Sequence, residues 1–91
     1  TTGGNSQAVS KQIRNMIDRM LPEEYEVLTR KMGAYREIAS INIKDAYLRE
    51  LALDEIIKQA ISNKYMIDDR KANKILDRYA KEDELRAKGM R

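Results

Sequence analysis

The 91-residue chain contains no cysteine and no histidine. Without these residues there is no disulfide framework, no cysteine nucleophile and no zinc site with thiolate or imidazole ligands. Catalysis by a serine and a histidine is excluded for the same reason. Carboxylates remain, but they occur as neighbours in sequence, which point about 100° apart on a helix and do not form a catalytic pair. We therefore predict a protein that is not an enzyme, with no catalytic residues, metal, cofactor or small-molecule substrate.

Strand-forming residues and chain breakers are also scarce. Phenylalanine and tryptophan are absent, and the only proline is Pro22. Residues 34–88 contain neither proline nor glycine, the two residues that most strongly interrupt regular structure. Isoleucine is frequent, but it recurs at helical rather than alternating spacings. The composition therefore predicts an all-α fold.

Long apolar runs are missing as well. No window approaches the roughly eighteen consecutive apolar residues that a membrane-spanning helix needs, so we expect no membrane partner. Residues 1–6 are polar and show neither the basic nor the apolar region of a signal peptide. On these grounds we expect the protein to be cytoplasmic.

Apolar residues recur at helical spacing in four segments, about 6–20, 22–39, 43–62 and 68–86. The pattern predicts a compact bundle of about four helices that forms a single domain over residues 6–88. Residues 1–5 are predicted to be a flexible N-terminal tail, and residues 89–91 a C-terminal tail. The last three helices fit the outline of a tri-helical, helix-turn-helix-like unit.

Three residues mark the predicted boundaries between these helices. Pro22 suits the first position of the second helix, and Asn42 is the predicted N-cap of the third. A rival interpretation is one continuous helix over 22–62, about 60 Å long. We prefer a break, because the apolar stripe of the second helix does not continue in phase into the third. Asp68 is the predicted N-cap of the last helix.

Two further residues have expected backbone roles. Asn63 follows the third helix and is able to take the left-handed conformation that often ends helices. Gly33 lies inside the second helix, where glycine costs about 1 kcal/mol relative to alanine. We expect it to mark either a close-packing point or a bend.

The formal net charge is +3, and it is unevenly distributed. Residues 22–69 carry seven basic and ten acidic groups, whereas residues 70–91 carry eight basic and four acidic groups. A basic end of this kind is typical of a surface that binds a polyanion, although it also suits packing against an acidic middle.

The last helix carries the most specific functional pattern. At 100° per residue, its cations fall on one face and its apolar residues on the opposite face, as expected for a helix that docks on the core and points cations at phosphates. Asp68 and Asp69 oppose this interpretation, because they lie at the end that usually enters the groove. Our leading hypothesis is a small non-enzymatic DNA-binding regulator or accessory protein. Its predicted nucleic-acid-binding residues are Arg70, Lys71, Asn73, Lys74, Arg78 and Lys81.

The alternative hypothesis is a helical protein–protein interaction or oligomerisation module with no nucleic-acid role. Methionines and tyrosines lie on the apolar stripes of the first two helices and suit adaptable contact surfaces, although ordinary core packing needs the same stripes. Their spacing also fits a dimeric helical interface, so a homodimer or another protein partner is plausible. The predicted interface residues are Met16, Met20, Tyr25, Leu28, Met32 and Tyr35.

Overall fold

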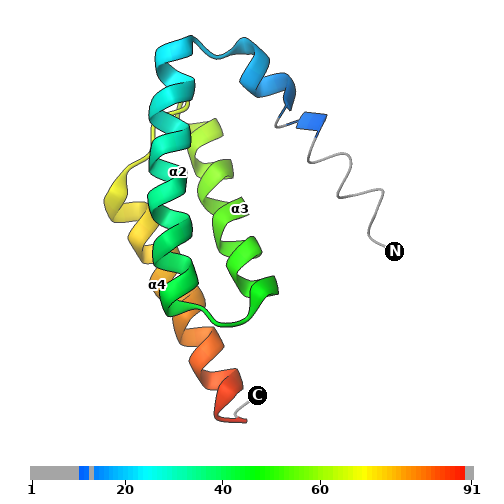
Figure 1. The fold of residues 1–91 in the computed structure, drawn as a ribbon, viewed down its shortest axis with the longest axis vertical. Coiled ribbons are helices and arrows are strands. Elements are labelled where there is room, and N and C mark those ends of the chain that lie inside the picture. Colours follow the sequence, from blue (N-terminus) through cyan, green and yellow to red (C-terminus); the bar gives the residue numbers. More distant parts are fainter. Residues whose placement is uncertain (1–10, 13, 90–91) are drawn as a thin grey trace.

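Three helices make up most of the computed structural model, which describes residues 11–12 and 14–89. They are α2 (Pro22–Asn42), α3 (Ala46–Ser62) and α4 (Asp69–Ala87). Helical turns over 14–19 precede α2 (Figure 1). The described residues contain no strand, so the predicted all-α bundle is confirmed. The start of the first predicted helix, at residues 6–10, lies outside the described residues.

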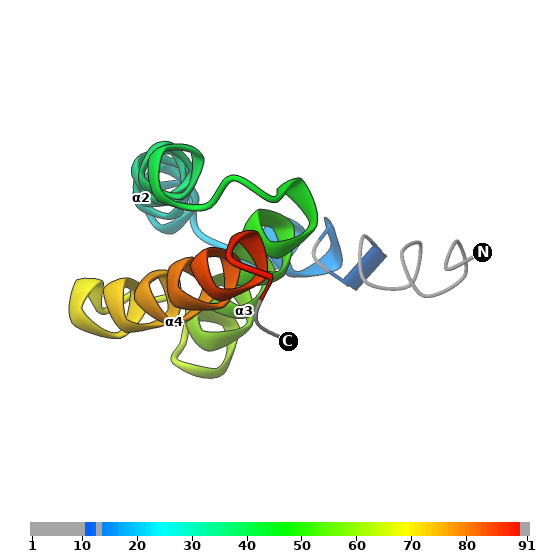
Figure 2. The same ribbon diagram turned by 90° about the horizontal axis from the view of Figure 1, so that it is seen from below.

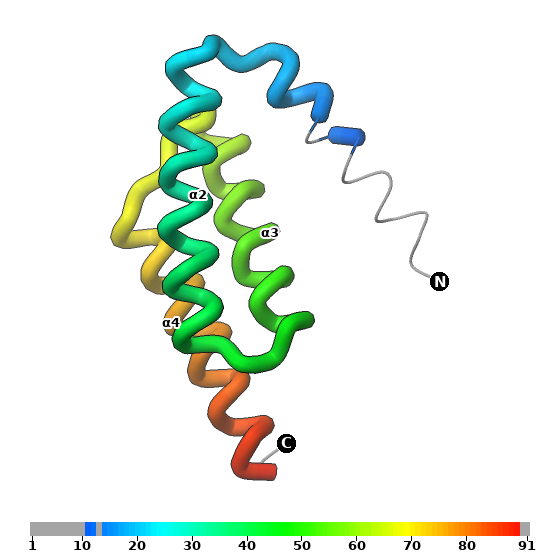
Figure 3. The backbone as a smooth tube through the Cα atoms, in the orientation of Figure 1, coloured from blue at the N-terminus to red at the C-terminus, as the bar shows by residue number. Residues whose placement is uncertain are grey.

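The helices α2 and α3 run antiparallel, joined by a short loop, and α4 crosses beside them (Figure 1). Each of the three helices packs against the other two. Seen from below, α3 and α4 both lie on one side of α2 (Figure 2). The backbone trace shows the N-terminal turns leading away from the start of α2 (Figure 3). Met20 of this segment packs with Leu28 of α2 and Ala60 of α3.

The start of α2 is as the sequence predicts. Pro22 occupies the first helical position, where its missing N–H costs nothing. The Glu24 side chain reaches back and accepts a hydrogen bond of 2.9 Å from the Leu21 N–H, which satisfies one donor at the helix end. Gly33 has open space around it. The expectation that it marks a close-packing point is therefore wrong.

The predicted break between α2 and α3 is confirmed, but its predicted cap is wrong. α2 continues to Asn42, whose side chain donates to the Ile38 carbonyl oxygen at 3.1 Å. The N-cap of α3 is Asp45, which accepts hydrogen bonds from the N–H groups of Tyr47 and Leu48. The reason is burial: Ile43 is fully buried, and its N–H bonds the Ala39 carbonyl oxygen at 2.8 Å. That bond extends α2 past the predicted boundary.

The connection between α3 and α4 differs from the prediction at one residue. Asn63 has a φ of −112°, and the left-handed residues are Lys64 and Tyr65, with φ of 56° and 68°. The Tyr65 N–H bonds the Ala60 carbonyl oxygen at 2.7 Å. In a Schellman motif, a bond of this kind joins residues five positions apart at the end of a helix. The left-handed residue of that motif lies one position after the cap, which here is Lys64. Asp68 caps α4 as predicted, accepting from the Arg70 N–H at 2.9 Å.

One apolar cluster fills the space between the three helices. Leu48 and Ile56 of α3 are almost fully buried, together with Ile43 of the loop. Ile75 and Leu76 bury the apolar face of α4 against them. Full burial of such a side chain contributes about 1.5–3 kcal/mol. The core therefore fixes which face of α4 is left for solvent.

Candidate nucleic-acid interface

All six predicted nucleic-acid-binding residues on α4 are exposed. The structure brings four cations into one row along the solvent face, because Arg70, Lys74 and Lys81 recur at helical spacing with Lys71 on their flank. Among the described residues, no carboxylate lies within ion-pairing distance of these four side chains. No ion pair within the described residues engages these cations, and the exposed carboxylate of Asp77 lies on the same face between Lys74 and Lys81.

Arg78 lies on the same face but is held within the chain. Its guanidinium forms an ion pair with Glu55 of α3 and lies over the Tyr79 ring, 5.2 Å from its centroid. The hydrogen bond to Glu55 raises the pKa of Arg78. Glu55 also accepts a hydrogen bond of 3.0 Å from the Tyr79 hydroxyl. A phosphate would have to compete with Glu55 for Arg78, so Arg78 is a weaker candidate contact than the four cations of the row.

Asn73 is exposed but lies about 60° around the helix from Arg70. That direction is the flank of α4 nearest α2, one turn beyond Asp69. Asn73 therefore lies outside the arc of about 100° that the four cations span, on the side opposite Lys71. Its predicted contact with a base edge would require α2 to approach the nucleic acid as well.

The N-terminal end of α4 is anchored to α2 by Asp69. The Tyr35 hydroxyl donates a hydrogen bond to the Asp69 carboxylate, and the Lys31 ammonium lies 3.6 Å from it. The Tyr35 bond lowers the pKa of Asp69. Burial, followed by the bond to Asp69, raises the pKa of the Tyr35 phenol. This end of α4 therefore carries fixed negative charge.

The connection from α3 to α4 spans residues 63–68 and is longer than the three or four residues of a helix-turn-helix. Together with the charge of Asp68 and Asp69, this length disfavours insertion of the N-terminus of α4 into a groove. The cations continue along the helix to Lys81 instead. The geometry therefore suits contact with a phosphate backbone along the length of α4.

The predicted protein-interface residues lie mostly inside the chain. Met16, Met20, Leu28 and Tyr35 are buried, and Met32 is half-buried. Tyr25 is the exception, with 43% of its surface exposed. The stripe that suggested an interface thus packs within this chain, and only Tyr25 of the set offers a substantial external contact.

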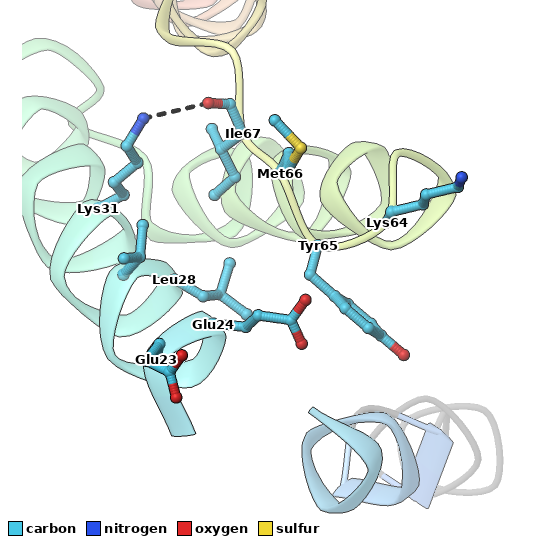
Figure 4. A pocket seen from close by; sticks show the side chains of 9 residues that line it. Glu23, Glu24, Leu28, Lys31, Lys64, Tyr65, Met66 and Ile67 are labelled. Carbon is cyan, nitrogen blue, oxygen red and sulfur yellow. Dashed lines mark hydrogen bonds between the residues drawn. The ribbon is translucent and has the colours of Figure 1, made fainter. Parts of the chain in front are cut away.

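Sequence reasoning missed an apolar pocket of about 310 Å³ between the start of α2 and residues 64–67. Leu28 and Ile67 line its interior (Figure 4), and Val27 and Met66 lie at its edge with 39% and 68% of their surfaces exposed. The Lys31 ammonium is turned away to the Ile67 carbonyl oxygen, 3.1 Å distant (Figure 4). In the sequence, the sign of this pocket is Val27, an apolar residue of α2 that lies outside the predicted apolar stripe.

Within residues 11–12 and 14–89, no cluster of acidic side chains has the form of a metal site. In the same residues, no helix combines the length and apolar character needed to cross a membrane. Comparison of the chain with protein-family models, curated proteins and solved structures finds no match.

Proposed function

We propose that the protein binds DNA through the solvent face of α4, as a small non-enzymatic regulator or accessory protein. The observation that carries this proposal is the row of Arg70, Lys71, Lys74 and Lys81, exposed and free of ion pairs among the described residues. Each Lys or Arg that neutralises a phosphate releases condensed counterions, which favours binding.

The opposite face of α4 supports the proposal because it holds the row in place. Ala72, Ile75 and Leu76 are buried in the core, and Asp83 of the same helix accepts hydrogen bonds from the N–H groups of Lys44 and Asp45. Both ends of α4 are thus tied to other elements, since Asp69 anchors the first turn. A fixed helix presents its cations without the ordering cost that a mobile segment would incur.

The proposal predicts contacts with phosphates rather than with bases. Phosphate contacts position a protein on the duplex but read no sequence. We therefore expect similar affinity for duplexes of different sequence and a steep loss of affinity with salt.

The test removes two free cations and compares them with two that are already paired. In the double variant Lys74→Ala/Lys81→Ala, the slope of log K against log salt should become shallower by about two units. The matched control is Arg36→Ala/Lys58→Ala, which removes the same charge from residues paired with Glu50 and Asp54.

Fluorescence anisotropy with a labelled random duplex measures both slopes. A shallower slope in the α4 variant alone supports the assignment. An equally shallower slope in both variants would show that net charge, and not this face, governs binding. If neither variant changes the slope, α4 is not the DNA-binding surface, and a helical protein-interaction module becomes the better hypothesis.

A further inference from the structure

A second apolar pattern runs along α2 directly beside the stripe that faces the core. Val27, Ala34 and Ile41 are exposed and seven residues apart, and between them lies Ile38, which is half-buried and also packs against the core. With Lys31 and Glu24 they follow the alternating three- and four-residue steps of a coiled-coil seam. Ile41 has 74% of its surface exposed, the largest fraction among the large apolar residues that the structure describes.

We propose that this face of α2 binds a second copy of the same chain, antiparallel and related by a two-fold axis level with residues 32 and 33. In this register the pairs across the interface are Ile38 with the partner's Val27, and Ala34 with the partner's Lys31. Next to the axis, the short side chain of Ala34 packs against the methylene stem of the partner's Lys31.

The charges beside the seam favour the antiparallel orientation. Arg30 and Glu37 are exposed, and neither has an ion-pair partner among the described residues. In the antiparallel register Arg30 lies beside the partner's Glu37, and the two-fold axis forms this pair twice. In a parallel pair of helices Arg30 would face the partner's Tyr35, which offers no opposite charge. Flanking charges of this kind set orientation in paired helices.

The one cation within the seam is Lys31, whose ammonium is held by the Ile67 carbonyl oxygen and Asp69. Only the methylene stem of Lys31 would face the partner, so the seam gains no buried free cation.

The apolar pocket gives this arrangement a specific contact. Ile41 lies opposite the partner's Glu24 and beside the partner's Val27, two residues that line the pocket. An isoleucine side chain matches the apolar interior formed by Leu28 and Ile67. The two-fold axis places each Ile41 at the pocket of the other copy. The exposed Ile41 and the open pocket are thus explained by one interface.

The first test is the oligomeric state of the full chain without nucleic acid, measured by sedimentation equilibrium over a wide concentration range. We expect a reversible monomer–dimer equilibrium. Ile41→Glu should raise the dimer dissociation constant about tenfold or more. Leu85→Glu is the matched control, since Leu85 is also an exposed apolar residue but lies on α4; it should leave the constant unchanged.

Both substitutions are at exposed positions, so circular dichroism should show unchanged helicity. A chain that is monomeric at every concentration would overturn the proposal. A dimer that withstands Ile41→Glu would overturn it equally.

The second test checks the register by charge reversal. Arg30→Glu alone brings two carboxylates together, because the new side chain lies beside the partner's Glu37, and it should weaken the dimer. Glu37→Arg alone should do the same with two cations. The double variant Arg30→Glu/Glu37→Arg restores opposite charges and should restore the affinity. Failure of the double variant to recover would overturn the antiparallel register.

These experiments are independent of DNA binding. Lys74→Ala/Lys81→Ala should dimerise like the unchanged chain, because both residues lie on α4. Weaker self-association in that variant would contradict the assignment of the interface to α2.

Discussion

At the scale of single residues, the strained backbone after α3 makes the sharpest prediction. Lys64 adopts a φ of 56°, a conformation that costs a non-glycine residue about 1–2 kcal/mol. Lys64→Gly removes this cost but gives the unfolded chain more freedom. We expect a net gain of about 0.5–1 kcal/mol in the free energy of unfolding, measured by urea denaturation.

The control for this prediction is the neighbouring residue. Asn63 has a φ of −112°, which a side chain tolerates, so Asn63→Gly should not stabilise the fold. Stabilisation by Asn63→Gly but not by Lys64→Gly would contradict the placement of the helix end.

The Tyr35–Asp69 contact predicts a dependence of stability on alkaline pH. The pKa of the Tyr35 phenol is raised in the folded chain by burial and by Asp69, so folding favours the neutral phenol. Its contribution is complete below the ordinary tyrosine pKa of about 10 and is lost as pH rises above that value. Tyr35→Phe should be less stable at neutral pH, and the difference from the unchanged chain should shrink above about pH 10.

Urea denaturation of both proteins at a series of alkaline pH values measures this difference. Every other ionisable side chain is the same in both proteins, so the difference isolates Tyr35. A difference that stays constant with pH would rule out the proposed role of the phenol.

At the scale of helices, Asn42 and Asp45 look equally suitable in sequence as the N-cap of α3, and the structure distinguishes them. Asp45 accepts hydrogen bonds from two N–H groups of the first turn. Asp45→Ala should therefore cost about 1 kcal/mol of stability. Asn42→Ala should change stability by less than about 0.5 kcal/mol, because Asn42 is exposed and its side chain bonds only a carbonyl oxygen of its own helix.

Thermal or urea unfolding of the two variants compares the caps directly. A larger loss from Asn42→Ala than from Asp45→Ala would contradict the observed boundary between α2 and α3.

Local signals predicted the helices well where they were strong. Pro22 and Asp68 begin α2 and α4 as expected, because proline geometry and an aspartate cap act within one turn. The cap at Asn42 was predicted wrongly because the deciding interaction is distant. Ile43 is buried in a core formed by three helices, and no local pattern contains that information.

At the scale of the whole molecule, the core determines which faces remain available. The sequence was sufficient to place the cations of α4 opposite its apolar residues, since helical periodicity separates them. It could not reveal that Glu55, in another helix, binds Arg78. It also could not separate the core-facing stripe of α2 from the exposed seam, because both are apolar and only packing shows which one is covered.

The central claim is that four free cations on α4 bind phosphates, and titration with salt tests it most directly. Binding of the unchanged chain to a random DNA duplex should weaken linearly in log–log form, with a slope of about −3 to −4 for four neutralised phosphates. Absence of binding at low salt, where non-specific electrostatic attraction is strongest, would contradict the account.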